Sequence, residues 1–305
     1  MPIKFAKLKD WYMGNLVKVL IYGQSGVGKT MAAAKAWHDL SRVLIALSES
    51  QGARNARIAN PEATAVSIRS LPEFWELHRA LMKPCPKCAR EVVVHGKPLK
   101  QRGSGCEHCR GTGVAGRAQF DLVVIDGITD LQRLIKIAVE TDPKRPEGDK
   151  KLRSGALAQD DWGVVAHYMT QVFMAIRDMP YHVVCTAIST EYINEDSGIY
   201  RARPCLQGNV SRNTIGEFFN LIAHVKKEYE EDAQGNIKVL RKGVFDHPAD
   251  EMTGKGDLSL NTQEPLDIAR WIDRVTHYDP SEEQQAPNEA PELEEPEGWG
   301  ASTDE

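Results

Sequence analysis

A glycine-rich loop near the N-terminus has the residue types that bind phosphate groups. It follows the pattern GxxxxGK[ST] and consists of Gly23, Gln24, Ser25, Gly26, Val27, Gly28, Lys29 and Thr30. The glycines let successive backbone N–H groups turn around a phosphate, the lysine ammonium reaches the β- and γ-phosphates, and the threonine hydroxyl is a ligand for Mg²⁺. The pattern predicts a site for ATP and Mg²⁺, and the alternative is an ordinary glycine turn.

Two carboxylates could complete this site. Asp126 ends FDLVVID, the most apolar strand-like run of the chain, where P-loop enzymes place a carboxylate that holds Mg²⁺ through water. Glu49 follows a second apolar run and could orient a water molecule for attack on the γ-phosphate; the alternative is an exposed loop acid. Asp121 lies at the other end of the Asp126 strand, so we expect it to be a surface residue.

The residue after Asp126 narrows the class of nucleotide-binding protein. It is Gly127, so the tandem acidic pair of many AAA-type and transporter ATPases is missing. The guanine-reading motif NKxD is also absent, which argues against a GTPase. We therefore expect an ATPase whose water-activating carboxylate is Glu49.

Four cysteines have the spacing of a zinc site. Cys85, Cys88, Cys106 and Cys109 form two C-x-x-C pairs separated by 17 residues, within the range of structural Zn²⁺ sites. The alternative is a pair of disulfides, which a reducing compartment disfavours. The spacing therefore predicts a zinc ribbon over residues 83–117.

Charge is distributed unevenly along the chain. Residues 83–117 contain eight Lys or Arg and two Glu, so the ribbon could grip a phosphate backbone or dock a protein. Residues 279–305 contain ten acidic and no basic residues, and removing them changes the formal charge from −5 to +5. We expect this tail to be disordered. It could compete with an anionic partner, dock a replication or recombination protein, or only aid solubility.

Strand-like and helix-like segments alternate over most of the chain. The expected strands are 16–22, 42–47, 120–126 and 182–188, and the expected helices are 30–40, 71–82, 131–140 and 160–178. Such alternation predicts an α/β fold with a mostly parallel sheet and helices on both faces. Segments 221–230 and 237–246 predict an antiparallel hairpin at the sheet edge, and a last helix is expected over 265–275.

The composition is typical of a globular protein. The chain has 305 residues, of which 41% are hydrophobic and 27% charged, enough for a sizeable core. No apolar run approaches the roughly 18 residues of a membrane helix, and residues 1–10 lack the apolar core of a signal peptide. We expect a cytoplasmic protein with an ATPase core at 1–278, interrupted by the ribbon at 83–117, and a tail at 279–305.

The chain resembles the RecA/RadA-type P-loop ATPases, and within them the phage core-only recombination proteins of the fourth Sak-like class of single-strand annealing proteins. The resemblance covers roughly residues 17–275 and rests on YGQSGVGKT, Glu49, FDLVVIDGITDL, the tripeptide DWG at 161–163 and HVVCTAIST. It implies a RecA-like fold, hydrolysis of Mg-ATP at a subunit interface of a homo-oligomeric ring or filament, and a location in a phage-infected bacterial cell.

The resemblance also implies roles for particular residues. It places a γ-phosphate sensor at Ser189 or Thr190, and DNA-contacting loops over 141–155 and 194–213. The basic residues of these loops are Lys144, Arg145, Lys150, Lys151, Arg153, Arg201, Arg203 and Arg212. Lys255 matches a K-D-R-like element that reaches the nucleotide of a neighbouring subunit, although the arginine of that element is missing here.

Three functions are compatible with these features. The first is an ATP-dependent protein that binds single-stranded DNA and promotes annealing or strand exchange. The second is a replication-accessory or helicase-loading ATPase whose ribbon and tail bind proteins. The third, a small-molecule kinase, lacks an arginine-rich lid and leaves the ribbon without a role. We expect the first, with ATP, Mg²⁺ and Zn²⁺ as cofactors.

Overall fold

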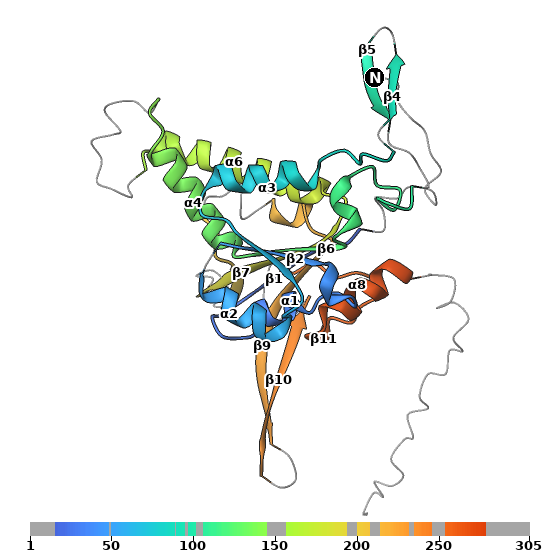
Figure 1. Cartoon of the computed structure of the whole chain (residues 1–305). Coiled ribbons are helices and arrows are strands. Elements are labelled where there is room, and N and C mark those ends of the chain that lie inside the picture. The colour runs from blue at the N-terminus through green and yellow to red at the C-terminus, as the bar shows by residue number, and fades with distance from the viewer. Residues whose placement is uncertain are drawn as a thin grey trace, which may run out of the picture.

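The computed structural model of the chain is shown in Figure 1. It describes residues 16–48, 50–88, 90–94, 97–101, 106–144, 157–193, 200–207, 214–231, 235–245 and 254–278. The predicted acidic tail lies outside the described residues, and so do six predicted site residues: Glu49, Arg145, Lys150, Lys151, Arg153 and Arg212. None of the described helices is long and apolar enough to cross a membrane.

A sheet of nine strands runs through the centre of the part of the chain that the structure describes. The strands are β1 (Lys18–Gly23), β2 (Val43–Leu47), β3 (Thr64–Ser67), β6 (Leu122–Asp126), β7 (His182–Ile193), β8 (Tyr200–Pro204), β9 (Leu221–Glu231), β10 (Ile237–Val244) and β11 (Gln263–Pro265). Their spatial order is β11-β10-β9-β1-β7-β6-β2-β3, and β8 pairs with β7 off this path. The strands from β9 to β3 in this order pair in parallel, whereas β8, β10 and β11 pair antiparallel.

Alternating side chains along the strands divide the core into two layers. In β1, Leu20 and Tyr22 belong to one buried cluster, whereas Val19 and Ile21 belong to the other, because successive side chains of a strand point to opposite faces. The first face is covered by α3 (Leu71–Leu81), α4 (Ile128–Glu140) and α6 (Gln159–Asp178). The second is covered by α1 (Lys29–Ala34), α2 (Ser50–Ala59) and α8 (Ile268–His277) (Figure 1).

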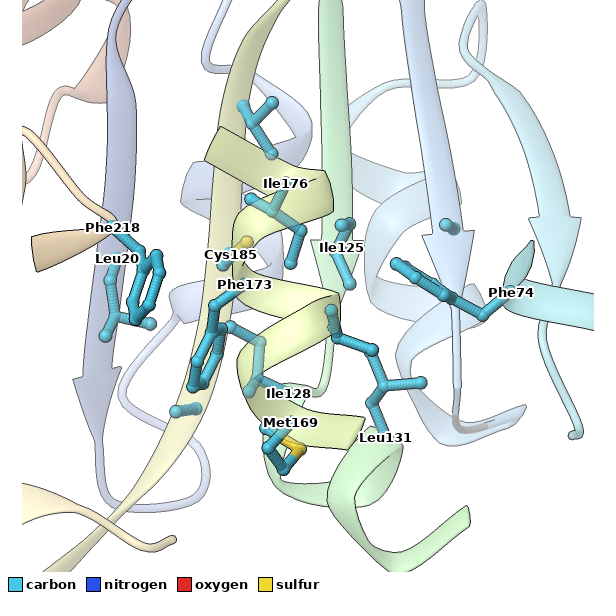
Figure 2. Packing of buried hydrophobic residues seen from close by; sticks show 14 of the residues in the cluster. Leu20, Phe74, Ile125, Ile128, Leu131, Met169, Phe173, Ile176, Cys185 and Phe218 are labelled. Atoms are coloured by element: carbon cyan, nitrogen blue, oxygen red, sulfur yellow. The ribbon is translucent and has the colours of Figure 1, made fainter. Parts of the chain in front are cut away.

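Helix α6 packs along the first face through an apolar stripe. Met169, Phe173 and Ile176 point from α6 toward the sheet, where they meet the buried Cys185 of β7 (Figure 2). The ring of Phe173 lies 5.4 Å from that of Phe218. Burial of each such side chain contributes about 1.5–3 kcal/mol, so this stripe fixes α6 on the sheet.

The predicted α/β fold, with its mostly parallel sheet and C-terminal hairpin, is confirmed. The helix predicted over 30–40 ends earlier, at Ala34, and a separate turn of 3₁₀ helix follows at Leu40–Arg42, where the Asp39 side chain accepts a hydrogen bond from the Ser41 N–H. The edge strand β3, which is largely exposed, was not predicted. Neither was β8, and β7 continues to Ile193 because it pairs with β8.

Candidate nucleotide and zinc sites

The glycine-rich loop connects β1 to α1. β1 ends at Gly23 and α1 begins at Lys29, as the GxxxxGK[ST] pattern predicts. Gly28 has a φ of +103°, a left-handed conformation that favours glycine. Gly23 is needed for another reason, since a Cβ atom there would lie 2.7 Å from the carbonyl oxygen of Val225 in β9. The glycines therefore shape the loop and let it approach the sheet.

Lys29 reaches back over this loop. Its Nζ donates hydrogen bonds to the carbonyl oxygens of Gly23 and Gln24, both at 2.8 Å. Ser25 and Gly26 line the same cavity as the lysine. The ammonium is thus held at the mouth of the loop, where the lysine of a P-loop contacts the β- and γ-phosphates.

Asp126 ends β6 beside the first turn of α1. The Thr30 hydroxyl donates to the Asp126 carboxylate, with 3.0 Å to each oxygen, and the Thr186 hydroxyl donates to Oδ1 at 2.6 Å. Burial raises the pKa of Asp126, while these two hydroxyls and the charge of Lys29 oppose the rise. Carboxylate and hydroxyl oxygens are the hard ligands that Mg²⁺ prefers, so Thr30 and Asp126 fit this ion.

The strand order explains which residue contacts Asp126 from the neighbouring strand. The strand that ends at Asp126 is not the neighbour of the strand that leads into the phosphate-binding loop, because β7 lies between β1 and β6. Thr186 of β7 holds the end of β6: its hydroxyl donates to the Asp126 carboxylate and accepts a hydrogen bond from the Gly127 N–H at 2.9 Å. Sequence reasoning placed Thr186 in a strand and assigned it no role.

A cavity of about 380 Å³ lies over these residues. It is lined by the loop, by the ends of β6 and β7, and by side chains that the sequence did not single out, among them Asn55 of α2, Thr129 and Asp130 of α4, and Arg241 of β10. The cavity therefore joins Lys29, Thr30 and Asp126 in one space, with room for the phosphates of a nucleotide.

Glu49 lies outside the described residues, but both of its flanks approach Asp126. The Ser48 hydroxyl donates to the carbonyl oxygens of Asp126 and Gly127 at 2.8 and 3.1 Å. A Cβ atom at Gly52 would lie 2.5 Å from Oδ2 of Asp126. Gly52 lines the cavity and Ser48 contacts the end of β6 beside it, and the role of Glu49 as the base stays a prediction.

Outside the glycine-rich loop, the remaining predicted nucleotide-site residues of the described chain do not line this cavity. Ser189 and Thr190 are in the part of β7 that pairs with Pro204 and Arg203 of β8, and neither residue lines the cavity. Lys255 bridges to Ile222, and its Nζ donates to the carbonyl oxygens of Gly216 and Phe219 at 3.0 and 2.9 Å. It lines a separate hollow with Lys18, at the start of β1, whereas the phosphate-binding loop follows the end of β1.

The predicted DNA-contacting residues are described in part. Lys144 follows α4, and its N–H donates to the Asp142 carboxylate at 2.8 Å. The backbone of Arg201 lies in β8 opposite Tyr192. Arg203, also in β8, places its guanidinium 4.2 Å from the centre of the Tyr192 ring.

A family model of AAA domains matches residues 15–260 of this chain. The chain belongs to this family. It is an AAA-type P-loop ATPase, although it lacks the second carboxylate that many such ATPases carry after the position of Asp126.

Two solved structures resemble this AAA domain. The KaiC-like protein PH0186 from Pyrococcus horikoshii OT3 is 12% identical, covering 75% of this chain and 77% of its own, with a TM-score of 0.36. The ATPase DotB from Legionella pneumophila is 13% identical, covering 77% of this chain and 47% of its own, with a TM-score of 0.28. No curated protein matches the sequence.

The four cysteines of the predicted zinc ribbon lie together in the AAA domain. The sulfur atoms of Cys85, Cys88, Cys106 and Cys109 all lie within 4.8 Å of one another. The shortest described separation, 3.4 Å between Cys88 and Cys109, exceeds the roughly 2.05 Å of a disulfide. The backbone N–H of Cys109 lowers the pKa of the Cys106 thiol to about 7, which favours the thiolate form. Four such sulfurs fit a tetrahedral Zn²⁺ ion.

The ribbon leaves and re-enters the AAA domain at one place. Pro84 and Val114 form an antiparallel bridge, the Cys85 N–H donates to the Gly113 carbonyl at 2.9 Å, and the Ala115 N–H donates to the Lys83 carbonyl at 2.8 Å. Between these stems, β4 (Arg90–Val94) and β5 (Lys97–Gln101) form a separate antiparallel hairpin. The cysteine pairs therefore stand at the base of this hairpin.

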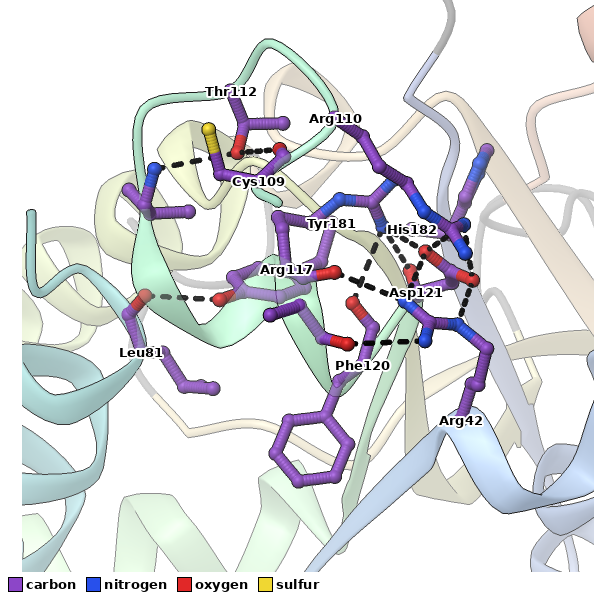
Figure 3. A network of polar contacts seen from close by, with 12 residues as sticks. Arg42, Leu81, Cys109, Arg110, Thr112, Arg117, Phe120, Asp121, Tyr181 and His182 are labelled. Atoms are coloured by element: carbon purple, nitrogen blue, oxygen red, sulfur yellow. Dashed lines mark hydrogen bonds and ion pairs between the residues drawn. The ribbon is translucent and has the colours of Figure 1, made fainter. Parts of the chain in front are cut away.

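Asp121 joins the ribbon to the central sheet. It is only 2% exposed, and its carboxylate accepts hydrogen bonds from Arg42 at 2.5 Å and Arg110 at 2.7 Å, with Arg117 2.9 Å away (Figure 3). The prediction that Asp121 is a surface residue is wrong, because three guanidiniums cover it. Burial tends to raise its pKa, but the hydrogen bond from Arg42 and the charges of Arg117, Arg42 and Arg110 lower the pKa below its usual value.

Purified protein is expected to contain about one zinc per chain, because four thiolates on two tight turns make one site. Elemental analysis of protein purified without chelator would measure it. A Cys106→Ser variant should lose the metal, and a Cys205→Ser variant should keep it, because Cys205 lies outside the cluster. Wild-type protein with no zinc, or with the four thiols oxidised, would contradict the assignment.

Proposed function

We propose that this ATPase is a recombination protein of phage type that binds single-stranded DNA in an ATP-dependent manner and promotes annealing or strand exchange. The observation that carries the proposal is the β7–β8 hairpin, where the guanidinium of Arg203 lies 4.2 Å from the centre of the Tyr192 ring. Aromatic rings and guanidiniums are surfaces on which unpaired bases stack, and basic side chains bind the phosphates between them. This hairpin is therefore our candidate DNA contact.

One strand links this hairpin to the nucleotide. Thr186 of β7 binds Asp126, and the same strand continues to Ile193, where it pairs with β8. The proposed γ-phosphate sensor, Ser189 or Thr190, lies between Thr186 and Ile193 on this strand. The Ser189 hydroxyl is buried and, within the described residues, has no hydrogen-bond partner. A displacement of Thr186 when the nucleotide binds or is hydrolysed would therefore move the part of β7 that pairs with β8. This connection supports the proposed dependence of DNA binding on ATP.

The second DNA-contacting segment is proposed to act with the first. Gln207, after β8, is bound to α4: the side-chain amide of Gln132 donates to its carbonyl oxygen at 2.8 Å, and Lys136 donates to its Oε1 at 2.9 Å. Segment 141–155 follows α4, and Gln207 belongs to segment 194–213, so α4 connects the two segments. This arrangement supports one shared surface for the DNA strand.

We further propose a homo-oligomer, a ring or a filament, in which Lys255 reaches the nucleotide of a neighbouring subunit. Its place near the start of β1, away from the loop of its own chain, is compatible with such a head-to-tail contact. The basic ribbon would add contacts to DNA or to a replication protein, and the acidic tail would dock a recombination partner.

DNA-stimulated turnover tests the proposal. ATP hydrolysis is expected to rise with single-stranded DNA, and DNA affinity should fall with salt at a log-log slope of about −3 to −4 for four to six phosphate contacts. Arg203→Gln should make this slope shallower by roughly 0.7, whereas Arg270→Gln, an exposed arginine on α8, should leave it unchanged.

Two other results would contradict this function. Turnover that ignores DNA, with a protein partner captured by the wild type and lost on removal of residues 279–305, would favour an accessory or helicase-loading ATPase. Turnover that responds only to a metabolite would indicate a kinase.

A further inference from the structure

We propose that Arg241 binds the phosphates of the nucleotide held by Lys29 of the same chain. The inference rests on nucleotide binding by the glycine-rich loop and adds a cation from the C-terminal hairpin to it. Arg241 is far from the loop in sequence, but β10 brings it to the rim of the phosphate cavity, which it lines together with Lys29, Thr30 and Asp126.

The backbone fixes where Arg241 points. β10 pairs with β9 and β11, and the carbonyl oxygen of Arg241 accepts a hydrogen bond from the Leu266 N–H at 2.9 Å. Gly243, two residues on and so on the same face of β10, approaches Trp271 of α8, where a Cβ atom would lie 2.3 Å from the indole. Arg241 therefore points to the face that carries α1 and the loop.

Its side chain reaches the loop itself. A Cβ atom placed on Gly28 would lie 3.1 Å from both Cδ and Nε of Arg241. The guanidinium is thus next to the residue that precedes Lys29. Because Gly28 has no side chain, the arginine can approach the backbone that would surround a phosphate.

The charges around Arg241 favour an anion rather than an internal ion pair. Among the described residues, two carboxylates line the cavity, and both have other partners: Asp126 is bound by the Thr30 and Thr186 hydroxyls, and Asp130 pairs with Arg133 at 3.0 Å. Within the described residues, Arg241 itself has no ion pair. A guanidinium matches two phosphate oxygens at once, so a nucleotide phosphate is the fitting partner.

Substitution of Arg241 tests the proposal by titration with Mg-ATP and Mg-ADP. Arg241→Gln should weaken binding of Mg-ATP roughly tenfold or more, as expected for loss of a charge-assisted hydrogen bond, and Arg241→Lys should recover part of the loss. The control is Lys238→Gln, an exposed cation on the opposite face of β10, which should bind as the wild type does. Unchanged binding by Arg241→Gln would overturn the proposal.

Two further arms separate the possible failures. If Lys29→Ala binds nucleotide like the wild type, the glycine-rich loop itself is not the site. If Lys29→Ala loses binding while Arg241→Gln keeps it, only the role of Arg241 is rejected. Mixing Lys29→Ala with Arg241→Gln protein tests for action within one chain. ATP turnover that stays low after mixing supports action within one chain. Recovered turnover would mean that Arg241 acts on a neighbouring subunit, and this result would overturn the proposal.

Discussion

A Lys29→Ala variant is expected to lose at least a hundredfold in affinity for Mg-ATP. The ammonium is held over the loop by the carbonyl oxygens of Gly23 and Gln24, at the mouth of the cavity that also contains Asp126. Its removal takes away charge-assisted hydrogen bonds to phosphate, each worth about 1.5–3 kcal/mol. Calorimetric titration with Mg-ATP would measure the loss.

A Glu49→Gln variant is the matched comparison, because it keeps the loop and changes only the proposed base. It should bind Mg-ATP like the wild type and hydrolyse it about a hundredfold more slowly, the effect expected when a positioned base is removed. Normal hydrolysis by this variant would reject Glu49 as the base. Unimpaired binding by Lys29→Ala would reject the loop as the nucleotide site.

An Asp121→Ala variant is expected to lose about 3 kcal/mol of its free energy of unfolding. Removing one partner of a buried ion pair costs about 3–5 kcal/mol, and the low end applies because Arg110 is half exposed. The change leaves Arg42, Arg110 and Arg117 facing one another without a counter-charge. Urea denaturation would measure the loss, and a zinc assay would show whether the ribbon loosens with it.

The comparison for Asp121 is Asp178→Ala. Asp178 also pairs with an arginine, Arg177, but both side chains are about half exposed, so this loss should stay below roughly 1 kcal/mol. Because the pKa of Asp121 is lowered on folding, its contribution should be complete above its unfolded pKa of about 3.8 and disappear as the pH falls through the folded value. Equal losses in the two variants would contradict the account of the network.

Short-range patterns allowed most of the fold to be predicted. The phosphate-binding loop could be predicted because the GxxxxGK[ST] residues are contiguous in the chain. The cysteine cluster could be predicted because the two cysteines of each C-x-x-C pair are close in sequence. Asp126 could be found because it ends a continuous apolar run. In contrast, β3 and β8 are four and five residues long, and β3 lies exposed at the sheet edge, so neither carried a clear apolar signal.

Residues that depend on the strand order could not be predicted. Thr186 and Asp126 are 60 residues apart in the chain. They meet only because β7 lies between β1 and β6 in the sheet. Arg241 joins the cavity because β9 pairs with β1 and brings the hairpin back over the loop. Asp121 was predicted to be a surface residue because it lies at a strand end. It is instead buried by arginines from three separate turns.

The two stems of the predicted ribbon pair with each other where they meet the rest of the chain. Paired residues of an antiparallel bridge such as Pro84 and Val114 stand only about 4.5–5.5 Å apart, so a short turn could join the flanking chain if the segment between them were excised. Excision would remove Arg110 from Asp121 but leave Arg42 and Arg117 as its partners. During evolution, the ribbon could be exchanged for a segment with another binding preference while the AAA domain that hydrolyses ATP stays the same.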